Sequence, residues 1–311
     1  MQEKIKKGLL FSSLLLFGST TMFGVYFTER VSRIRKKSSE EIYNREKQLG
    51  HIDEQTLQAL PKEELRIPSP HGYMISALAI TPHETNKYMI FSHGVTENKL
   101  SSMKYANLFL KRGFNTVIYD QRRHGNTGGN STSYGFYEKD DLRAIVQWLR
   151  KTKGEVFLGI HGESMGAATT LLYAAENKNG ADFYIVDCPF SDLKELLTYR
   201  IECEMKWIPA KLILPIGNLF LKLRDKYGME DVSPLAVIGR IEEPILFIHS
   251  KKDDYILPYM TEDLYQRKKG PKMLFLAENG AHAQSLNENR TEYEAAIDHF
   301  LKQYVFCDTA P

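Results

Sequence analysis

The pentapeptide Gly162-Glu163-Ser164-Met165-Gly166 carries the clearest catalytic pattern in the sequence. It follows an apolar run at 156–160 and precedes a run of small and apolar residues that is typical of a helix. In a G-x-S-x-G turn between a strand and a helix, the two glycines allow the tight bend that lifts the serine Oγ clear of the sheet. The pattern therefore predicts that Ser164 is a nucleophile and that its chemistry is acyl transfer.

A serine hydroxyl is a weak nucleophile unless a base takes its proton and a carboxylate orients that base. For a serine in this type of turn, the partners follow along the chain in the order serine, acid, histidine. His282 lies in a polar, glycine-containing loop that comes directly after the apolar run at 273–277. We therefore expect His282 to be the general base.

Two neighbouring aspartates, Asp253 and Asp254, follow the preceding apolar run and are both candidates for the acid. Asp253 lies four residues past His249 and three residues before Ile256, which favours it. A proline is expected four residues after the acid, however, and Pro258 lies four residues after Asp254. We expect Asp253 to be the acid and keep Asp254 as the alternative.

The predicted site also needs hydrogen-bond donors for the negative charge that develops on the substrate oxygen. The backbone N–H of Met165, directly after the nucleophile, is expected to be one donor. The second is expected from the loop at 91–98, where His93 and Gly94 would turn the chain and the N–H of Val95 would point at the site. Because this donor belongs to the backbone, the side chain of Val95 carries almost no signal, and His93 itself is expected to be structural.

Composition argues against other classes of function. The 41 basic and 39 acidic residues give a net charge of +2, which is too balanced for a nucleic-acid surface. The nine histidines include no His-Glu-x-x-His pair, and Cys188, Cys203 and Cys307 are too widely spaced for a zinc or disulfide pattern, so we expect them to pack. We expect no metal, no cofactor and no nucleic-acid partner, and a small-molecule or lipid-like acyl substrate.

From residue 63 onward, short apolar runs alternate with amphipathic stretches. The first two runs are separated by Pro-Ser-Pro-His-Gly and predict an antiparallel pair. Later, 103–112 and 140–151 predict helices, the second with Leu142, Ile145 and Leu149 on one face. Strands this apolar must be covered on both faces, which predicts an α/β fold with a mostly parallel sheet and helices on each side. The predicted strands are 64–67, 73–80, 88–92, 115–120, 156–160, 183–187, 245–249 and 273–277.

An insertion at about 191–241 interrupts this alternation with no strand-like run. An insertion of this length usually has a function. Its apolar side chains, Trp207 and Phe220 among them, fit either an additional pair of core helices or a helical cap over the substrate. If the insertion is a cap, we expect Trp207 and Phe220 to bind substrate.

The N-terminal region has a different composition. Residues 9–27 contain no charge in nineteen positions, which matches the roughly 30 Å core of a bilayer, and basic residues lie on both sides. A cleaved signal peptide is the alternative, but the run is long and no Ala-x-Ala-like site follows it. We expect residues 1–37 to be a single transmembrane anchor to the cell membrane, 38–62 a polar helical stalk, and 63–311 the catalytic domain. Because basic residues flank both ends, the charge pattern does not set the membrane side of that domain.

Seven motifs together make the chain similar to the α/β-hydrolase superfamily and, more narrowly, to an uncharacterised group of membrane-anchored hydrolases from Gram-positive bacteria. The resemblance implies an α/β-hydrolase fold and a triad of Ser164, Asp253 and His282, because the family's acid lies four residues past the matching histidine. It departs from the family at Leu257, where proline is usual. The motifs are HGVTEN (93–98), YDQRRHGNTGG (119–129), SYGFYEKDDL (133–142), HGESMG (161–166), DCPF (187–190), FIHSKKDDYI (247–256) and AENGAHA (277–283).

The resemblance implies cleavage of an ester, thioester, amide or peptide bond, and the fold does not choose among them. Of these we favour a carboxylic ester, with a peptidase or amidase as the alternative. A catalytically inactive binding protein is disfavoured because it would have no chemical reason to keep Ser164, Asp253 and His282 together. A haloalkane or epoxide hydrolase is excluded because it needs an aspartate at position 164.

Overall fold

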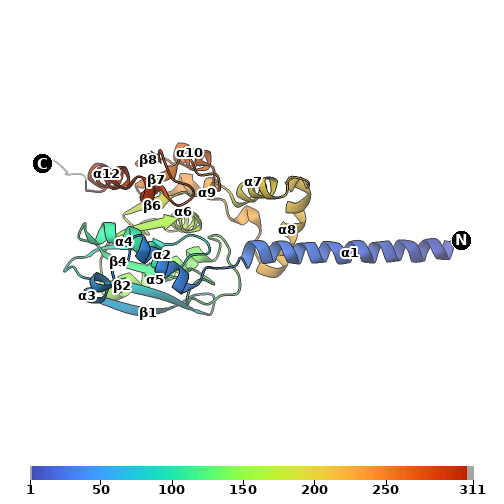
Figure 1. Cartoon of the computed structure of the whole chain (residues 1–311), viewed down its shortest axis with the longest axis horizontal. Coiled ribbons are helices and arrows are strands. Elements are labelled where there is room, and N and C mark those ends of the chain that lie inside the picture. The colour runs from blue at the N-terminus through green and yellow to red at the C-terminus, as the bar shows by residue number, and fades with distance from the viewer. Residues whose placement is uncertain (1, 307–311) are drawn as a thin grey trace.

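A computed structural model describes the backbone of residues 2–306 and, within that range, all side chains except those of residues 2–5 and 8–16. Its centre is one eight-stranded sheet in the order β1-β2-β4-β3-β5-β6-β7-β8 (Figure 1). β2 pairs antiparallel with both β1 and β4, and all other neighbours pair in parallel. The mostly parallel sheet is therefore confirmed. The strands are β1 (Lys62–Pro68), β2 (Met74–Ile80), β3 (Lys87–Ser92), β4 (Asn115–Tyr119), β5 (Phe157–Glu163), β6 (Phe183–Asp187), β7 (Ile245–Ser250) and β8 (Lys272–Ala277).

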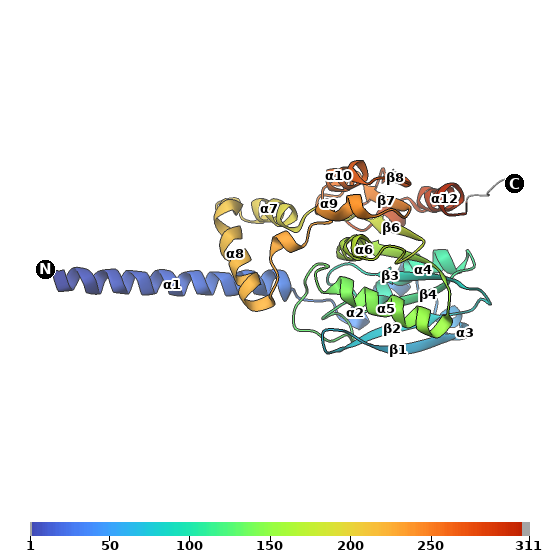
Figure 2. The ribbon, with the colours of Figure 1, turned by 180° about the vertical axis from the view of Figure 1, so that it is seen from behind.

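Helices cover both faces of the sheet, as the apolar strands require. One face packs against α5 (Glu138–Lys153), α6 (Met165–Glu176) and α10 (Pro258–Arg267), and the other against α4 (Met103–Leu110) and α12 (Arg290–Phe300). Figure 2 shows α5 and α6 in front of the sheet, and Figure 1 shows α4 on the opposite side. The short helices α9 (Pro234–Val237) and α11 (Ser285–Glu288) complete the two layers.

Helix α5 illustrates how the sequence produces these elements. Leu142, Ile145, Val146 and Leu149 recur on one face and are buried against the sheet. The first turn is acidic and the last turn basic, so both ends oppose the helix dipole. Gly154 follows the helix with φ 78°, a backbone conformation that glycine adopts without strain.

The two long helices of the insertion, α7 (Leu193–Glu204) and α8 (Ala210–Asp225), project from the sheet beside α1 (Gln2–Ser32) (Figures 1 and 2). The contact between α1 and α8 is close because each helix offers a glycine to an aromatic ring of the other. A Cβ at Gly24 would overlap the ring of Phe220, and a Cβ at Gly217 would overlap the ring of Phe27. The C-terminal part of α1 is thus packed on the insertion.

The residues at 38–62, predicted to be a polar helical stalk, contain two helices and pack on the domain. Helix α2 (Ser39–Gln48) buries Ile42, and its Arg45 pairs with Glu97 in the loop after β3. Helix α3 (Glu54–Ala59) follows, and the chain then enters β1 directly. The boundary predicted between residues 37 and 38 therefore does not separate two independent units.

Part of the predicted anchor at 9–27 lies outside the described side chains. Among the residues that are described, no helix is both long enough and apolar enough to cross a membrane. The transmembrane anchor is therefore not confirmed and stays a prediction.

Candidate active site

The turn that carries Ser164 lies between β5 and α6, where the G-x-S-x-G pattern places it. Ser164 adopts φ 54° and ψ −116°, a conformation that is strained for a residue with a side chain. Both glycines are required by close backbone approach, since a Cβ at Gly162 would overlap the carbonyl of Gly166 and a Cβ at Gly166 would overlap that of Ser92. The backbone of this turn therefore holds Ser164 at the carboxyl edge of the parallel strands.

Ser164, His282 and Asp253 form one continuous chain of hydrogen bonds. The Ser164 Oγ lies 2.9 Å from His282 Nε2, and His282 Nδ1 lies 2.7 Å from Asp253 Oδ2. With Nδ1–H donating to the carboxylate, Nε2 carries the lone pair that accepts the serine proton. The structure brings together these three predicted residues, which come from the loops after three different strands.

Both carboxylate oxygens of Asp253 accept hydrogen bonds that hold the side chain in place. Oδ1 accepts the backbone N–H groups of Tyr255 and Ile256 at 2.9 and 3.0 Å, and Oδ2 also accepts from Nε2 of His249 at 3.1 Å. Burial alone would raise the pKa of Asp253, but the hydrogen bonds from His249 and His282 hold that pKa well below its ordinary value. The carboxylate is therefore charged and fixed beneath the imidazole.

Asp254, the alternative acid, is exposed and is not hydrogen-bonded to His282; its backbone carbonyl accepts from Tyr199. The geometry thus favours Asp253. The contact of His249 with Asp253 was not predicted from the sequence. The spacing of four residues between His249 and Asp253 could have indicated this contact, because it lets the two side chains meet across the turn.

The two predicted oxyanion donors flank Ser164. Met165 is the first residue of α6, where backbone N–H groups have no partner within the helix. Val95 lines the same cavity as Ser164, and a Cβ built at the neighbouring Gly94 would lie 3.5 Å from the Ser164 Cβ. His93 is buried, with Nε2 accepting the N–H of Gln121 at 3.0 Å and Nδ1 donating to the Gly94 carbonyl at 2.7 Å. It holds this loop, as expected of a structural residue.

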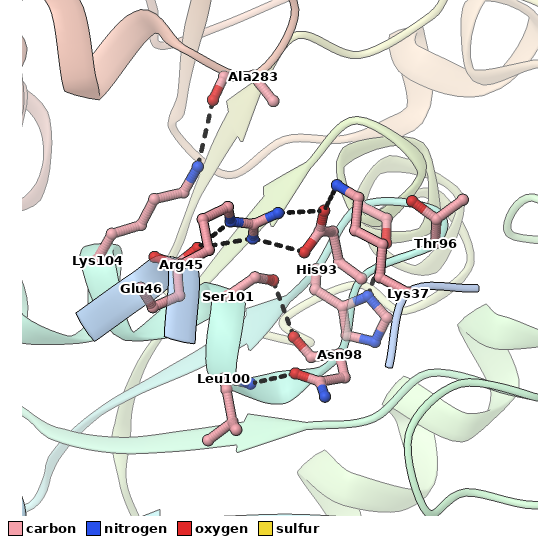
Figure 3. Close-up of polar contacts among 12 residues, drawn as sticks. Lys37, Arg45, Glu46, His93, Thr96, Asn98, Leu100, Ser101, Lys104 and Ala283 are labelled. Atoms are coloured by element: carbon pink, nitrogen blue, oxygen red, sulfur yellow. Dashed lines mark hydrogen bonds and ion pairs between the residues drawn. The ribbon is translucent and has the colours of Figure 1, made fainter. Parts of the chain in front are cut away.

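A cavity of about 740 Å³ opens over the triad, and much of its wall comes from the N-terminal segment. Ile34, Lys37, Arg45, Glu46 and Leu49 line it together with Ser164 and His282. Figure 3 shows Lys37 and Arg45 reaching toward the loop that carries His93 and Thr96. No sequence signal indicated this, because the approach of residues 34–49 to the nucleophile depends on tertiary packing.

The charged side chains around this cavity neutralise one another. Arg45 donates two hydrogen bonds to Glu97, at 3.0 and 2.7 Å, and also pairs with Glu46 at 2.6 Å. Burial raises the pKa of Glu97, but Arg45 and Lys37 outweigh it and lower this pKa to about 2. The cavity therefore has polar walls without a large net charge.

A second buried ion pair lies behind the nucleophile. Lys104 Nζ lies 2.5 Å from Glu163, the residue before Ser164, and donates to the carbonyl of Ala283 beside His282 at 3.2 Å. Coulomb attraction to Glu163 raises the pKa of Lys104 despite the opposing effect of burial. Lys104 therefore ties the loop of the nucleophile to the loop of the base. Figure 3 shows its contact with Ala283.

Trp207 and Phe220, which were expected to bind substrate, are not at this cavity. Trp207 lies between α7 and α8 and is 95% exposed, and the ring of Phe220 packs against Gly24. The expectation failed because apolar composition does not distinguish a pocket wall from a helix contact or an exposed surface.

One group among the described residues has the spacing of a metal site. Cys188 Sγ, the Asp253 carboxylate and the His282 imidazole lie within 4.8 Å of one another. Burial raises the pKa of the Cys188 thiol well above its ordinary value, which disfavours the thiolate that a metal requires. The other two residues are hydrogen-bonded to each other. Cys188 is buried, as predicted, whereas Cys203 is exposed and Cys307 lies outside the described residues.

The comparisons with known proteins concern the fold and the family of the chain. A family model described as serine aminopeptidase S33 matches residues 83–224. YqkD, an uncharacterised protein of Bacillus subtilis, is 48% identical over 95% of this chain and 97% of its own length. YfhR, an uncharacterised protein of Escherichia coli, is 25% identical over 76% of this chain and 74% of its own. An esterase of Pyrococcus furiosus shares the fold, with a TM-score of 0.66 at 22% identity, covering 83% of this chain and 94% of that one. The chain therefore has the fold of the α/β hydrolases and belongs to one family with YqkD of Bacillus subtilis.

Proposed function

We propose that this protein is a serine hydrolase that cleaves a carboxylic ester through an acyl-enzyme on Ser164. The observation that carries the proposal is the hydrogen-bond chain from Ser164 Oγ through His282 to a charged Asp253. In this arrangement the serine proton has an acceptor, and the acceptor is held in the required tautomer.

The reaction has two halves that use the same groups. Ser164 Oγ attacks the ester carbonyl while His282 Nε2 takes its proton, and the N–H groups of Val95 and Met165 stabilise the oxyanion. His282 then returns the proton to the leaving alcohol, and the acyl group stays on Ser164. A water molecule deprotonated by His282 releases the acid and restores the serine.

The polar wall of the cavity favours an ester over the N-terminal peptide that an aminopeptidase would bind. An aminopeptidase needs carboxylates that are available to bind the substrate ammonium group. Glu46, Glu97 and Glu163 line the cavity, but each already has a cation partner, in Arg45 or Lys104. Asp254, the fourth carboxylate of the lining, is exposed to solvent, where an ion pair with an ammonium group contributes little to binding.

The test compares nitrophenyl acyl esters with an aminoacyl anilide and a peptide anilide, using the full chain in a non-ionic detergent. We expect ester turnover and labelling of Ser164 by a fluorophosphonate, both lost in Ser164→Ala. Faster turnover of an anilide than of every ester would replace the esterase with a peptidase. Failure of the protein to react with esters, anilides and the fluorophosphonate would refute the hydrolase itself.

We also propose that residues 9–27 hold the enzyme at the cell membrane. The proposal is supported by the uncharged run in the sequence and by apolar side chains that are exposed next to it. Phe17 and Met22 on α1 are each 73% exposed. On the neighbouring α8 and the turn before it, the exposed side chains are Trp207, Leu212, Leu219 and Leu223. Tryptophan is favoured at the interface between a bilayer and water.

Carbonate extraction of membranes from cells that make the protein tests this proposal. We expect the full chain to stay with the membranes and a chain that begins at Met22 to be released more readily. Release of the full chain by carbonate would contradict the anchor and leave the triad unaffected.

A further inference from the structure

A second, apolar cavity lies next to the triad cavity, between α1, α7 and α8. Its volume is about 380 Å³. Ile34 and Tyr255 line both cavities, so the two adjoin at these side chains. The ring of Tyr255 lies 5.0 Å from the His282 imidazole between ring centres, so this shared wall lies directly beside the base.

Most of the side chains that line this cavity are apolar or aromatic. Three of its walls are apolar side chains at helical spacing: Phe23, Phe27 and Val31 from α1, Leu197 and Ile201 from α7, and Ile213 from α8. Most of the charged residues of the lining are held in ion pairs: Glu204 with Arg200 at 2.8 Å and Arg30 at 3.7 Å, and Glu29 with Arg224 of α8 at 2.8 Å. Arg35 is the remaining charged residue of the lining. Such a lining fits an unbranched hydrocarbon chain better than a polar or charged group.

The α1 wall is built into the fold and is not an accidental contact. Tyr134 donates to the backbone carbonyl of Val31 at 3.1 Å, and Thr132 N–H donates to that of Ser32 at 2.7 Å. Arg33 pairs with the buried carboxylate of Asp225 at the end of α8 at 2.8 Å. Together with the reciprocal glycine contacts between α1 and α8, these bonds fix the N-terminal helix against the insertion.

The geometry points to an acyl-chain pocket, one wall of which is the N-terminal helix itself. This inference rests on the proposed function, since it places the acyl part of the ester in the apolar cavity while its carbonyl lies at Ser164. The substrate class is then an ester of a medium- or long-chain carboxylic acid. The alcohol part lies on the polar side, near Arg45 and Glu97.

The inference predicts a dependence of turnover on acyl length. Each buried methylene is expected to raise kcat/KM by up to about fourfold, before the cost of ordering the chain reduces the gain. We therefore expect the octanoate ester of nitrophenol to be hydrolysed more efficiently than the acetate ester.

Two variants in different walls test the pocket in the full chain. Ile201→Trp fills the cavity from α7, and Phe23→Ala removes an apolar contact from α1. Both should lower the ratio of octanoate to acetate kcat/KM, Ile201→Trp by about tenfold or more. The controls are Ile208→Trp and Phe17→Ala, which make the same changes at exposed positions outside the cavity.

Equal ratios in the two variants and the controls would overturn the pocket while leaving the esterase intact. If Ile201→Trp does not fold, as judged by thermal unfolding, Phe23→Ala decides alone. Failure of the proposed function is a separate outcome, because the wild type would then react neither with the acetate ester nor with a short-chain fluorophosphonate.

Discussion

Replacing Asp253 by asparagine probes the triad sharply because the new side chain has nearly the same shape and a different pattern of donors. In the structure both oxygens of Asp253 accept two hydrogen bonds each, from Tyr255 and Ile256 on one side and from His249 and His282 on the other. An asparagine has only one oxygen, so its NH₂ group must face two donors in either orientation.

If the NH₂ group faces the histidines, His282 must turn its Nδ1 into an acceptor. Its Nε2 then carries the proton and cannot accept another from Ser164. The same change in a serine-protease triad lowers kcat by about 10⁴, equivalent to about 5 kcal/mol. We expect a loss of that order for Asp253→Asn.

The assay is kcat/KM on a nitrophenyl ester, with thermal unfolding to show that the variant is folded. Asp254→Asn is the matched control: its carboxylate is exposed, and we expect less than about a threefold effect, as for most surface substitutions. A larger loss for Asp254→Asn than for Asp253→Asn would transfer the acid role to Asp254 and refute the assignment.

Three further predictions follow from the packing and the charges. Gly166→Ala should cost about 1–3 kcal/mol of stability or more, because its Cβ would meet the Ser92 carbonyl; Gly18→Ala has no atom nearby and should not lower the melting temperature. The pKa of Glu97 is lowered from about 4.5 to about 2 in the folded protein, so its ion pairs stabilise fully above about pH 4.5 and lose their effect as the pH falls toward 2. Glu97→Gln should therefore melt below the wild type at pH 7 and approach it near pH 3. A chain that begins at Ser38 should melt well below one that begins at Met22, because it lacks the buried Phe27 and Val31; equal melting temperatures would show that α1 does not support the fold.

The sheet, the turn that carries Ser164 and the order of the triad residues could be predicted because each depends on a short stretch of sequence. The strands are apolar throughout, α5 repeats its apolar residues every three or four positions, and the two glycines around Ser164 form a short pattern that can be read directly. The sequence favours Asp253 as the acid but also leaves Asp254 as a candidate. Which of these two neighbouring carboxylates faces His282 depends on the backbone of the turn at 253–256.

The role of the N-terminal segment could not be predicted because it depends on shape complementarity between distant residues. Gly24 and Phe220 are ordinary residues in a sequence, and only their packing shows that each accommodates the other. Likewise, the contact of Arg45 with Glu97 joins two segments more than fifty residues apart. The same charged residues that suggested a solvated stalk line the catalytic cavity.

The formation of an acyl-enzyme on Ser164 tests the central claim most directly. The protein is mixed with an excess of a nitrophenyl ester, quenched in acid and analysed by mass spectrometry of the intact chain and its peptides. We predict one added acyl group, on the peptide that contains Ser164, and none in Ser164→Ala. Protein-dependent ester hydrolysis without this adduct would contradict the acyl-enzyme on Ser164. So would an acyl adduct on another residue that forms and breaks down fast enough to account for turnover.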